Sequence, residues 1–176
     1  MDDNWDFLSE ETVFQCPRFS VGYDKVETPD GSVNNYYWID RPENAVAVVA
    51  IQNDNVIMVE QYRPKLDHTF IECPGGHVKK DETYPEAASR ELREETGIFA
   101  GKFTYLTTYY PTATTCYERA VVIAQNLSEG ESEPDEGEYI EWDYIPVETA
   151  FGIAMNQPTT GWTLTPLLLA RKEGYI

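Results

Sequence analysis

One segment, residues 75–98, constrains the fold of this chain more than any other: GGHVKKDETYPEAASRELREETGI. Thr83 is followed three residues later by Glu86, which predicts a helix-capping box, and Pro85 occupies the permitted first turn. Gly97 offers the left-handed residue at which helices commonly stop. We therefore predict a helix that begins near Thr83 and ends before Gly97.

This predicted helix carries three glutamates, Glu91, Glu94 and Glu95, whose spacing places their carboxylates on one face. Like charges at these spacings repel each other by roughly a few tenths of a kcal/mol per pair. A hard divalent cation such as Mg²⁺ or Mn²⁺ would explain the cluster, and such ions suit phosphate substrates. A solvated, charged helix face is the plainer explanation, but it leaves the placement of Gly76 and Glu82 unexplained.

Other residues of the segment fit the same site. Glu82, just before the helix, is interpreted either as an outer metal ligand or as a structural hydrogen-bond acceptor. Arg90 stands four residues before Glu94 and can pair with it, which would fix the orientation of that carboxylate. Gly75 and Gly76 allow the backbone to turn tightly and to approach a metal, so that a backbone carbonyl can complete its ligands.

The rest of the chain is rich in strand patterns. Alternation around Pro29-Asp30-Gly31 predicts a β-hairpin, and two apolar runs broken at residues 52–55 predict a second, more buried one. Further strands are expected at residues 69–72, 103–110, 119–127 and 138–146, and short helices at 147–156 and 163–172. Because strands and helices do not alternate, the pattern favours an α+β fold or a mixed α/β sandwich. We expect an N-terminal antiparallel β subdomain at residues 1–42 and a main domain at 43–176.

Composition narrows the range of partners. The 176 residues include 31 acidic and 13 basic ones, a formal net charge of -18, which should repel nucleic acids and anionic membranes. The same acidity fits a surface adapted to a saline interior. Three cysteines without paired spacing predict reduced thiols, and the start MDDNWDFLSEE lacks the features of a signal peptide. We therefore expect a cytoplasmic protein that binds neither nucleic acid nor membranes.

The segment resembles the signature of the Nudix hydrolases at every fixed position: Gly76, Glu82, Arg90, Glu91, Leu92, Glu94, Glu95, Gly97 and Ile98. The resemblance implies an α/β/α sandwich and metal-dependent hydrolysis of a nucleoside diphosphate linked to another group. It implies Mg²⁺ as the cofactor, with Mn²⁺ as the alternative. On this interpretation Glu91 and Glu95 are metal ligands, Glu94 is a ligand or a catalytic partner of metal-bound water, and Gly75 adds a backbone ligand. Four residues have structural roles in the motif: Gly76, Glu82, Arg90 and Gly97.

The flanking sequence resembles the ADP-ribose pyrophosphatase branch of that superfamily, through Gln61-Tyr62-Arg63 and Glu72-Cys73-Pro74-Gly75-Gly76. In this interpretation Arg63 grips a phosphate. Glu72 binds substrate or metal, or only orients Arg63. Pro111 is expected to contact the substrate, although it stands in Tyr-Pro-Thr-Ala where the branch often has Ser-Pro-Gly.

Two more features follow from the same resemblance. The stretch DEGEYIEW is similar to the segment that supplies a further catalytic glutamate, which implies Glu136 or Glu138 as the general base. The N-terminal subdomain resembles one that builds a homodimer in relatives. The expected function is Mg²⁺-dependent hydrolysis of ADP-ribose to AMP and ribose 5-phosphate. The alternatives are a pyrophosphatase for GDP-mannose or another nucleotide sugar and, from a different class, a non-catalytic nucleotide-sensing module.

Overall fold

The computed structural model describes residues 5–130 and 140–176. The chain divides into two compact units, one comprising Met1–Asn44 with Tyr110–Glu118 and the other Ala45–Tyr109 with Arg119–Ile176. The predicted domains, residues 1–42 and 43–176, do not assign residues 110–118 to the first unit. The bounds of these two domains stay a prediction. No helix in the described ranges combines the length and the apolar character that a membrane span needs.

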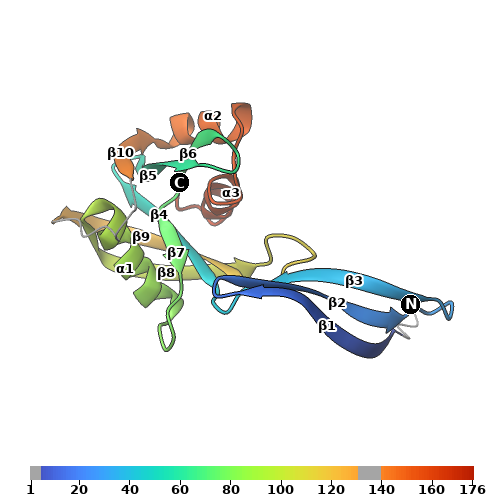
Figure 1. The fold of residues 1–176 in the computed structure, drawn as a ribbon. Coiled ribbons are helices and arrows are strands. Elements are labelled where there is room, and N and C mark those ends of the chain that lie inside the picture. The colour runs from blue at the N-terminus through green and yellow to red at the C-terminus, as the bar shows by residue number, and fades with distance from the viewer. Residues whose placement is uncertain (1–4, 131–139) are drawn as a thin grey trace. The chain divides into compact units, whose positions relative to one another are not determined.

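The described part of the first unit is built on an antiparallel sheet with the strand order β1-β2-β3 (Figure 1). Its strands are β1 (Asp6–Cys16), β2 (Phe19–Glu27) and β3 (Val33–Asp40). The predicted hairpin is confirmed, because Gly31, at φ 82°, turns the chain between β2 and β3. Strand β1 falls in the acidic start of the chain, outside every predicted strand. Residues 110–118 contact β3 at Ile39, whose N–H donates to the Thr114 carbonyl at 2.8 Å.

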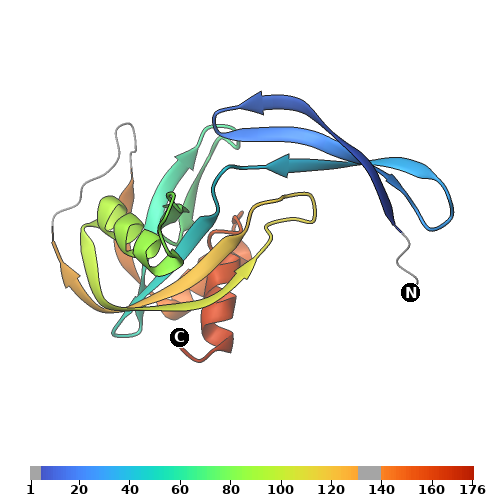
Figure 2. The ribbon, with the colours of Figure 1, turned by 90° about the horizontal axis from the view of Figure 1, so that it is seen from below.

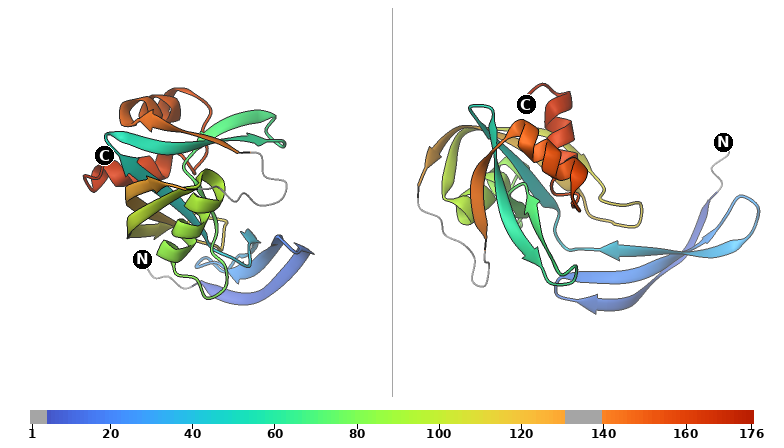
Figure 3. Two further views of the ribbon diagram at one scale, coloured as in Figure 1. Left: turned by 90° about the vertical axis from the view of Figure 1, so that its left-hand side faces the viewer. Right: turned by 90° about the horizontal axis from the view of Figure 1, so that it is seen from above.

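The second unit contains a mixed sheet that has seven strands within the described residues. They are β4 (Ala45–Gln52), β5 (Asn55–Arg63), β6 (His68–Glu72), β7 (Gly75–His77), β8 (Ile98–Tyr109), β9 (Arg119–Glu129) and β10 (Glu141–Pro146). The second predicted hairpin is confirmed as β4 and β5, joined by Asn53 and Asp54 at φ 49° and 61°. These two strands pair with each other only beside the turn. Farther from the turn, β4 pairs with β7 and β9, and β5 pairs with β6 and β10 (Figure 3).

Helices cover both faces of this sheet (Figures 1 and 2): α1 (Tyr84–Thr96), α2 (Val147–Asn156) and α3 (Leu164–Lys172). On one face, Ala88 and Leu92 of α1 pack against Val46 and other buried residues of the strands. On the opposite face, α2 and α3 pack on a second core cluster that includes Val49. Strand β4 is buried on both sides, with Val46 and Val49 serving different cores. The predicted α/β/α sandwich is confirmed.

Candidate active site

Helix α1 carries the carboxylates of the site, and local hydrogen bonds fix both of its ends. The Glu86 N–H donates to the Thr83 hydroxyl at 3.4 Å, and the Thr83 N–H donates to the Glu86 carboxylate at 2.8 Å. At the other end Gly97 adopts φ 71° and its N–H donates to the Arg93 carbonyl at 2.8 Å. The predicted capping box and left-handed stop are both confirmed, so the sequence determines where the glutamates lie along the helix.

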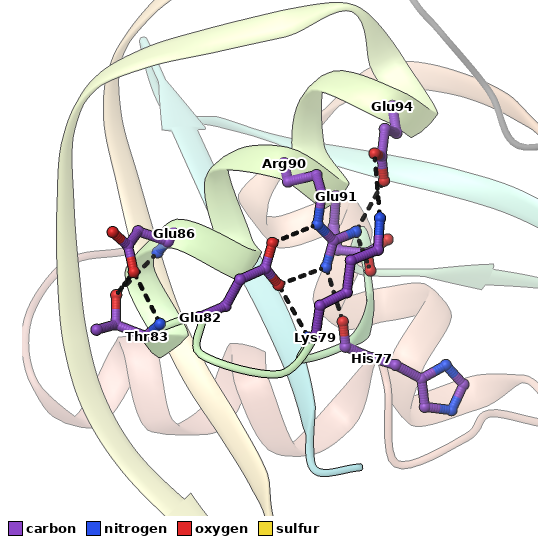
Figure 4. A network of polar contacts seen from close by, with 8 residues as sticks. All are labelled: His77, Lys79, Glu82, Thr83, Glu86, Arg90, Glu91 and Glu94. Atoms are coloured by element: carbon purple, nitrogen blue, oxygen red, sulfur yellow. Dashed lines mark hydrogen bonds and ion pairs between the residues drawn. The ribbon is translucent and has the colours of Figure 1, made fainter.

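Arg90 stands at the centre of a hydrogen-bond network that gathers the carboxylates (Figure 4). Its Nε donates to Glu82 Oε1 at 2.7 Å, and its Nη2 donates to Glu82 Oε2 at 2.9 Å and to the His77 carbonyl at 2.8 Å. Its Nη1 donates to Glu91 Oε1 and to Glu94 Oε2, each at 2.8 Å. These contacts, with Glu82 first, raise the pKa of Arg90, which therefore stays charged. One positive charge thus offsets the repulsion among three glutamates.

Glu82 supports this network from the loop before α1. Both of its oxygens accept hydrogen bonds from Arg90, and Oε2 also accepts one from the Lys79 N–H at 2.9 Å. The hydrogen bonds from Arg90, followed by the one from Lys79, lower the pKa of Glu82 to about 2 although partial burial opposes them. Of the two interpretations of Glu82, these contacts match the structural acceptor.

Two glycines bring backbone into contact with the acidic face of α1. The Gly75 N–H donates to Glu95 Oε2 at 2.9 Å, and Glu95 is only 9% exposed. A Cβ placed on Gly76 would lie 2.5 Å from the Glu91 carboxylate, closer than real Cβ atoms come. A side chain at position 76 would therefore displace the Glu91 carboxylate, whereas glycine leaves it in place.

The donor set fits a hard divalent cation. Glu91 and Glu94 are mostly shielded, with side chains 13% and 14% exposed, and Glu95 lies beside them on the same helix face. Within residues 5–130 and 140–176, no three Asp, Glu, His or Cys side chains are arranged so that they alone could coordinate a metal ion. Mg²⁺ characteristically binds through one or two carboxylates and takes its other ligands from water and substrate phosphates. The carboxylates of α1 suit that mode of binding.

A second polar cluster joins Arg63, the last residue of β5, to Glu72, the last residue of β6. Arg63 donates to Glu72 Oε2 through Nε at 3.1 Å and also through Nη2, and Glu72 is almost fully buried. The Thr160 hydroxyl, from the loop between α2 and α3, donates to Glu72 Oε1. Of the interpretations of Glu72, this geometry matches the one in which it orients Arg63. Burial, with a smaller effect from Glu72, raises the pKa of the neighbouring Cys73 thiol, which is therefore neutral and structural.

The roles predicted for Pro111, Glu136 and Glu138 stay predictions. Pro111 lies in the segment of residues 110–118 that belongs to the first unit, so its contact with substrate stays a prediction. Glu136 and Glu138 lie outside the described residues, and their role as general base also stays a prediction.

Sequence reasoning missed two residues of these networks. Lys79 Nζ lies 3.8 Å from Glu94 Oε1, and Lys79 occupies one of the variable positions between Gly76 and Glu82. Thr160 is separated from Glu72 by 88 positions. No local pattern connects residues so far apart, so only the fold reveals this contact.

Comparisons with known proteins agree with the fold. A NUDIX domain matches residues 41–166. The ADP-ribose pyrophosphatase of Bacillus subtilis is 34% identical over 154 residues, which cover 85% of this chain and 83% of the relative. The methanol dehydrogenase activator of Bacillus methanolicus is 33% identical over 147 residues, covering 81% and 79% respectively.

A solved structure extends the comparison to nearly the whole chain. The crystal structure of an ADP compounds hydrolase matches with a TM-score of 0.86, covering 98% of this chain and 97% of the other at 24% identity. At that identity the match shows the fold alone. The fold and the carboxylate-bearing helix place the chain in a class of α/β/α sandwich hydrolases. More specifically, the chain belongs to the Nudix family and is a Nudix hydrolase.

Proposed function

We propose that this protein hydrolyses the diphosphate of ADP-ribose, giving AMP and ribose 5-phosphate, with Mg²⁺ as its cofactor and Mn²⁺ as the alternative. The observation that carries the proposal is the set of carboxylates on one face of α1, organised by Arg90 and approached closely by the Gly76 backbone. The Bacillus subtilis relative, which is named an ADP-ribose pyrophosphatase, supports the choice of substrate.

In this proposal Glu91 and Glu95 hold the cation, and Glu94 and the Gly75 carbonyl are further ligands. A bound divalent cation would neutralise charge on the diphosphate and lower the pKa of a nearby water. The chain contributes orientation: Arg90 holds Glu91 and Glu94 by hydrogen bonds of 2.8 Å, so their carboxylates need little rearrangement to act.

The remaining roles concern the substrate and the proton. Arg63 is proposed to bind a phosphate oxygen, because its side chain is 37% exposed while Nε and Nη2 are held by the buried Glu72. Pro111 is proposed to contact the substrate. Glu136 or Glu138 is proposed to accept the proton from the attacking water, which requires one of them to come within hydrogen-bond reach of it.

A panel of nucleoside diphosphate substrates tests the proposed reaction. We expect ADP-ribose to be hydrolysed fastest in the presence of Mg²⁺. When the reaction is run in water labelled with heavy oxygen, the label should enter only one of the two products, and that product identifies the attacked phosphorus. Faster turnover of GDP-mannose would favour the alternative nucleotide-sugar pyrophosphatase. Binding of ADP-ribose without release of phosphate products would favour the nucleotide-sensing module.

The variant Glu95→Gln tests the metal site. A glutamine oxygen can still accept the hydrogen bond from the Gly75 N–H, so we expect an unchanged fold, whereas loss of the charge should lower kcat by roughly 100-fold or more. Glu148→Gln, the same substitution at an exposed position of α2, is the matched control and should turn over like the wild type. A Glu95→Gln enzyme with wild-type rates would overturn the assignment.

We also propose that the protein is a homodimer that associates through the first unit. The support is the set of large apolar side chains that the sheet β1–β3 exposes, among them Phe7, Val13 and Tyr37 at 62%, 61% and 63%. Large apolar side chains that are exposed together on one sheet are characteristic of association sites. Light scattering should give twice the chain mass for the wild type and a monomer for Val13→Asp. Asn35→Asp adds the same charge at an exposed polar position of β3 and should stay dimeric; a monomeric wild type would refute this proposal.

A further inference from the structure

The loop between α2 and α3 is fastened to three consecutive residues at the end of β6. The Thr163 hydroxyl donates to the Ile71 carbonyl at 2.7 Å, and the Cys73 N–H donates to the Trp162 carbonyl at 3.2 Å. Between these two contacts, the Thr160 hydroxyl donates to Glu72 Oε1. The loop therefore fixes both the backbone that leads into β7 and the one carboxylate that lies within it.

The Thr160 hydroxyl has little freedom to point elsewhere. The Trp162 N–H donates to Thr160 Oγ1 at 3.1 Å, which occupies one lone pair of the oxygen and leaves its proton for Glu72. The Thr163 N–H also donates to the Thr160 carbonyl at 3.2 Å, which closes a backbone turn over residues 160–163. Thr160 is therefore held by its own loop in the orientation that serves Glu72.

The two oxygens of Glu72 have separate tasks. Oε1 accepts from Thr160, and Oε2 accepts from Nε and Nη2 of Arg63. Glu72 is only 1% exposed, and a buried carboxylate is costly unless its oxygens are paired. Without Thr160, Oε1 would lose a donor, and the carboxylate would be free to rotate and share Arg63 between its oxygens.

The loop is also held by the last residue of β8 and the first residue of β9. The Trp162 ring lies 3.8 Å from the guanidinium carbon of Arg119, a residue that is 8% exposed, and the Tyr109 hydroxyl donates to the Gly161 carbonyl at 2.8 Å. The buried Arg119 therefore supports the loop by stacking on it. These contacts hold the loop that carries Thr160, as the role of positioning another side chain requires.

We propose that Thr160 is a positioning residue for substrate binding: its hydrogen bond fixes the orientation of Glu72, which in turn presents the Arg63 guanidinium to a phosphate of the substrate. The inference rests on the proposed function, in which Arg63 binds the diphosphate. It adds a residue from outside the signature and its flanks. The contacts connect Thr160 of the α2–α3 loop to the buried Glu72 carboxylate, and Glu72 to the partly exposed Arg63 guanidinium.

Steady-state kinetics with ADP-ribose and Mg²⁺ test the link, using Thr160→Val and Thr160→Ser. Losing a hydrogen bond to a charged group should lower kcat/KM roughly tenfold or more in Thr160→Val, mainly by raising KM, because Arg63 binds substrate and transition state alike. Thr160→Ser keeps the hydroxyl and should recover most of the loss. Thr163→Val is the matched control: it removes a hydroxyl from the same loop but touches only the Ile71 carbonyl. We expect it to lower the unfolding temperature without changing KM.

A double-substitution cycle makes the test specific to Arg63. In an Arg63→Lys background, where the two-nitrogen contact with Glu72 is lost, Thr160→Val should have little additional effect on KM. Additive losses, an unchanged KM in Thr160→Val, or an equal rise in KM in Thr163→Val would each overturn the positioning role. If Thr160→Val fails to fold, Thr160→Ala takes its place in the same cycle. If the wild type does not hydrolyse ADP-ribose, the proposed function is refuted. The same double-substitution cycle would then be measured with the substrate of the panel that is hydrolysed fastest.

Discussion

A single arginine reconciles the acidic face of α1 with a stable helix. Glu91 and Glu94 lie three residues apart on that face and would repel each other, but Arg90 Nη1 donates to both of them. Glu82 accepts from the other side of the same guanidinium and is itself held by a backbone N–H. The repulsion that the spacing predicts is therefore offset within the protein, and the carboxylates stay oriented.

The pair of Glu82 and Arg90 should make stability depend on pH. Because the pKa of Glu82 is held at about 2, below its ordinary 4.5, the pair stabilises the folded state above pH 4.5 and loses this contribution as the pH falls towards 2. The shift corresponds to on the order of 3 kcal/mol at most. In urea unfolding, Glu82→Gln should be less stable than the wild type at pH 6, and the difference should shrink below pH 4.5.

Glu43→Gln, at an exposed position, is the control for that measurement and should unfold near the wild-type midpoint at pH 6. The pH trend is the decisive result. A stability difference between Glu82→Gln and the wild type that stays constant from pH 6 to pH 3 would contradict the role assigned to this pair.

Among the secondary-structure elements, those with strong local signals were predictable from the sequence. The capping box at Thr83 and the left-handed Gly97 define α1, and the observed α2 and α3 match the predicted segments 147–156 and 163–172. Strand β1 was not predictable, because it is exposed along nearly its whole length and lacks alternation. It forms by pairing with β2, a partner that no local pattern names.

The same distinction applies to the candidate site. The motif spacing predicted that α1 brings its glutamates together, because positions along a helix follow from sequence alone. The contact of Thr160 with Glu72 could not be predicted, since it depends on how the α2–α3 loop returns to β6. The parallel pairing of β4 with β9 is equally non-local. The local sequence pattern therefore predicted the residues of the motif. Residues that orient side chains next to the motif, such as Thr160, are revealed only by the fold.

At the scale of the whole molecule, the net charge of -18 should make stability depend on salt. Like charges repel more in the compact state than in the unfolded chain, and added ions screen them over about 10 Å at 0.1 M and about 3 Å at 1 M. We expect the urea midpoint of unfolding to rise between those two concentrations of sodium chloride. Chloride is preferable to sulfate here, because sulfate stabilises folded proteins by exclusion whatever their charge.

One facing pair of strands allows that repulsion to be relieved without salt. Glu141 of β10 lies directly opposite Glu60 of β5, and both are exposed. Like charges in directly facing positions destabilise a sheet, so Glu141→Lys should stabilise the protein by about 0.5 kcal/mol at low salt, and the gain should shrink at high salt as the pair is screened. Glu43→Lys makes the same change in net charge at an exposed position outside the strands. If both variants gain equally, the overall charge is responsible; if neither gains and salt leaves the wild-type midpoint unchanged, the acidity does not limit stability.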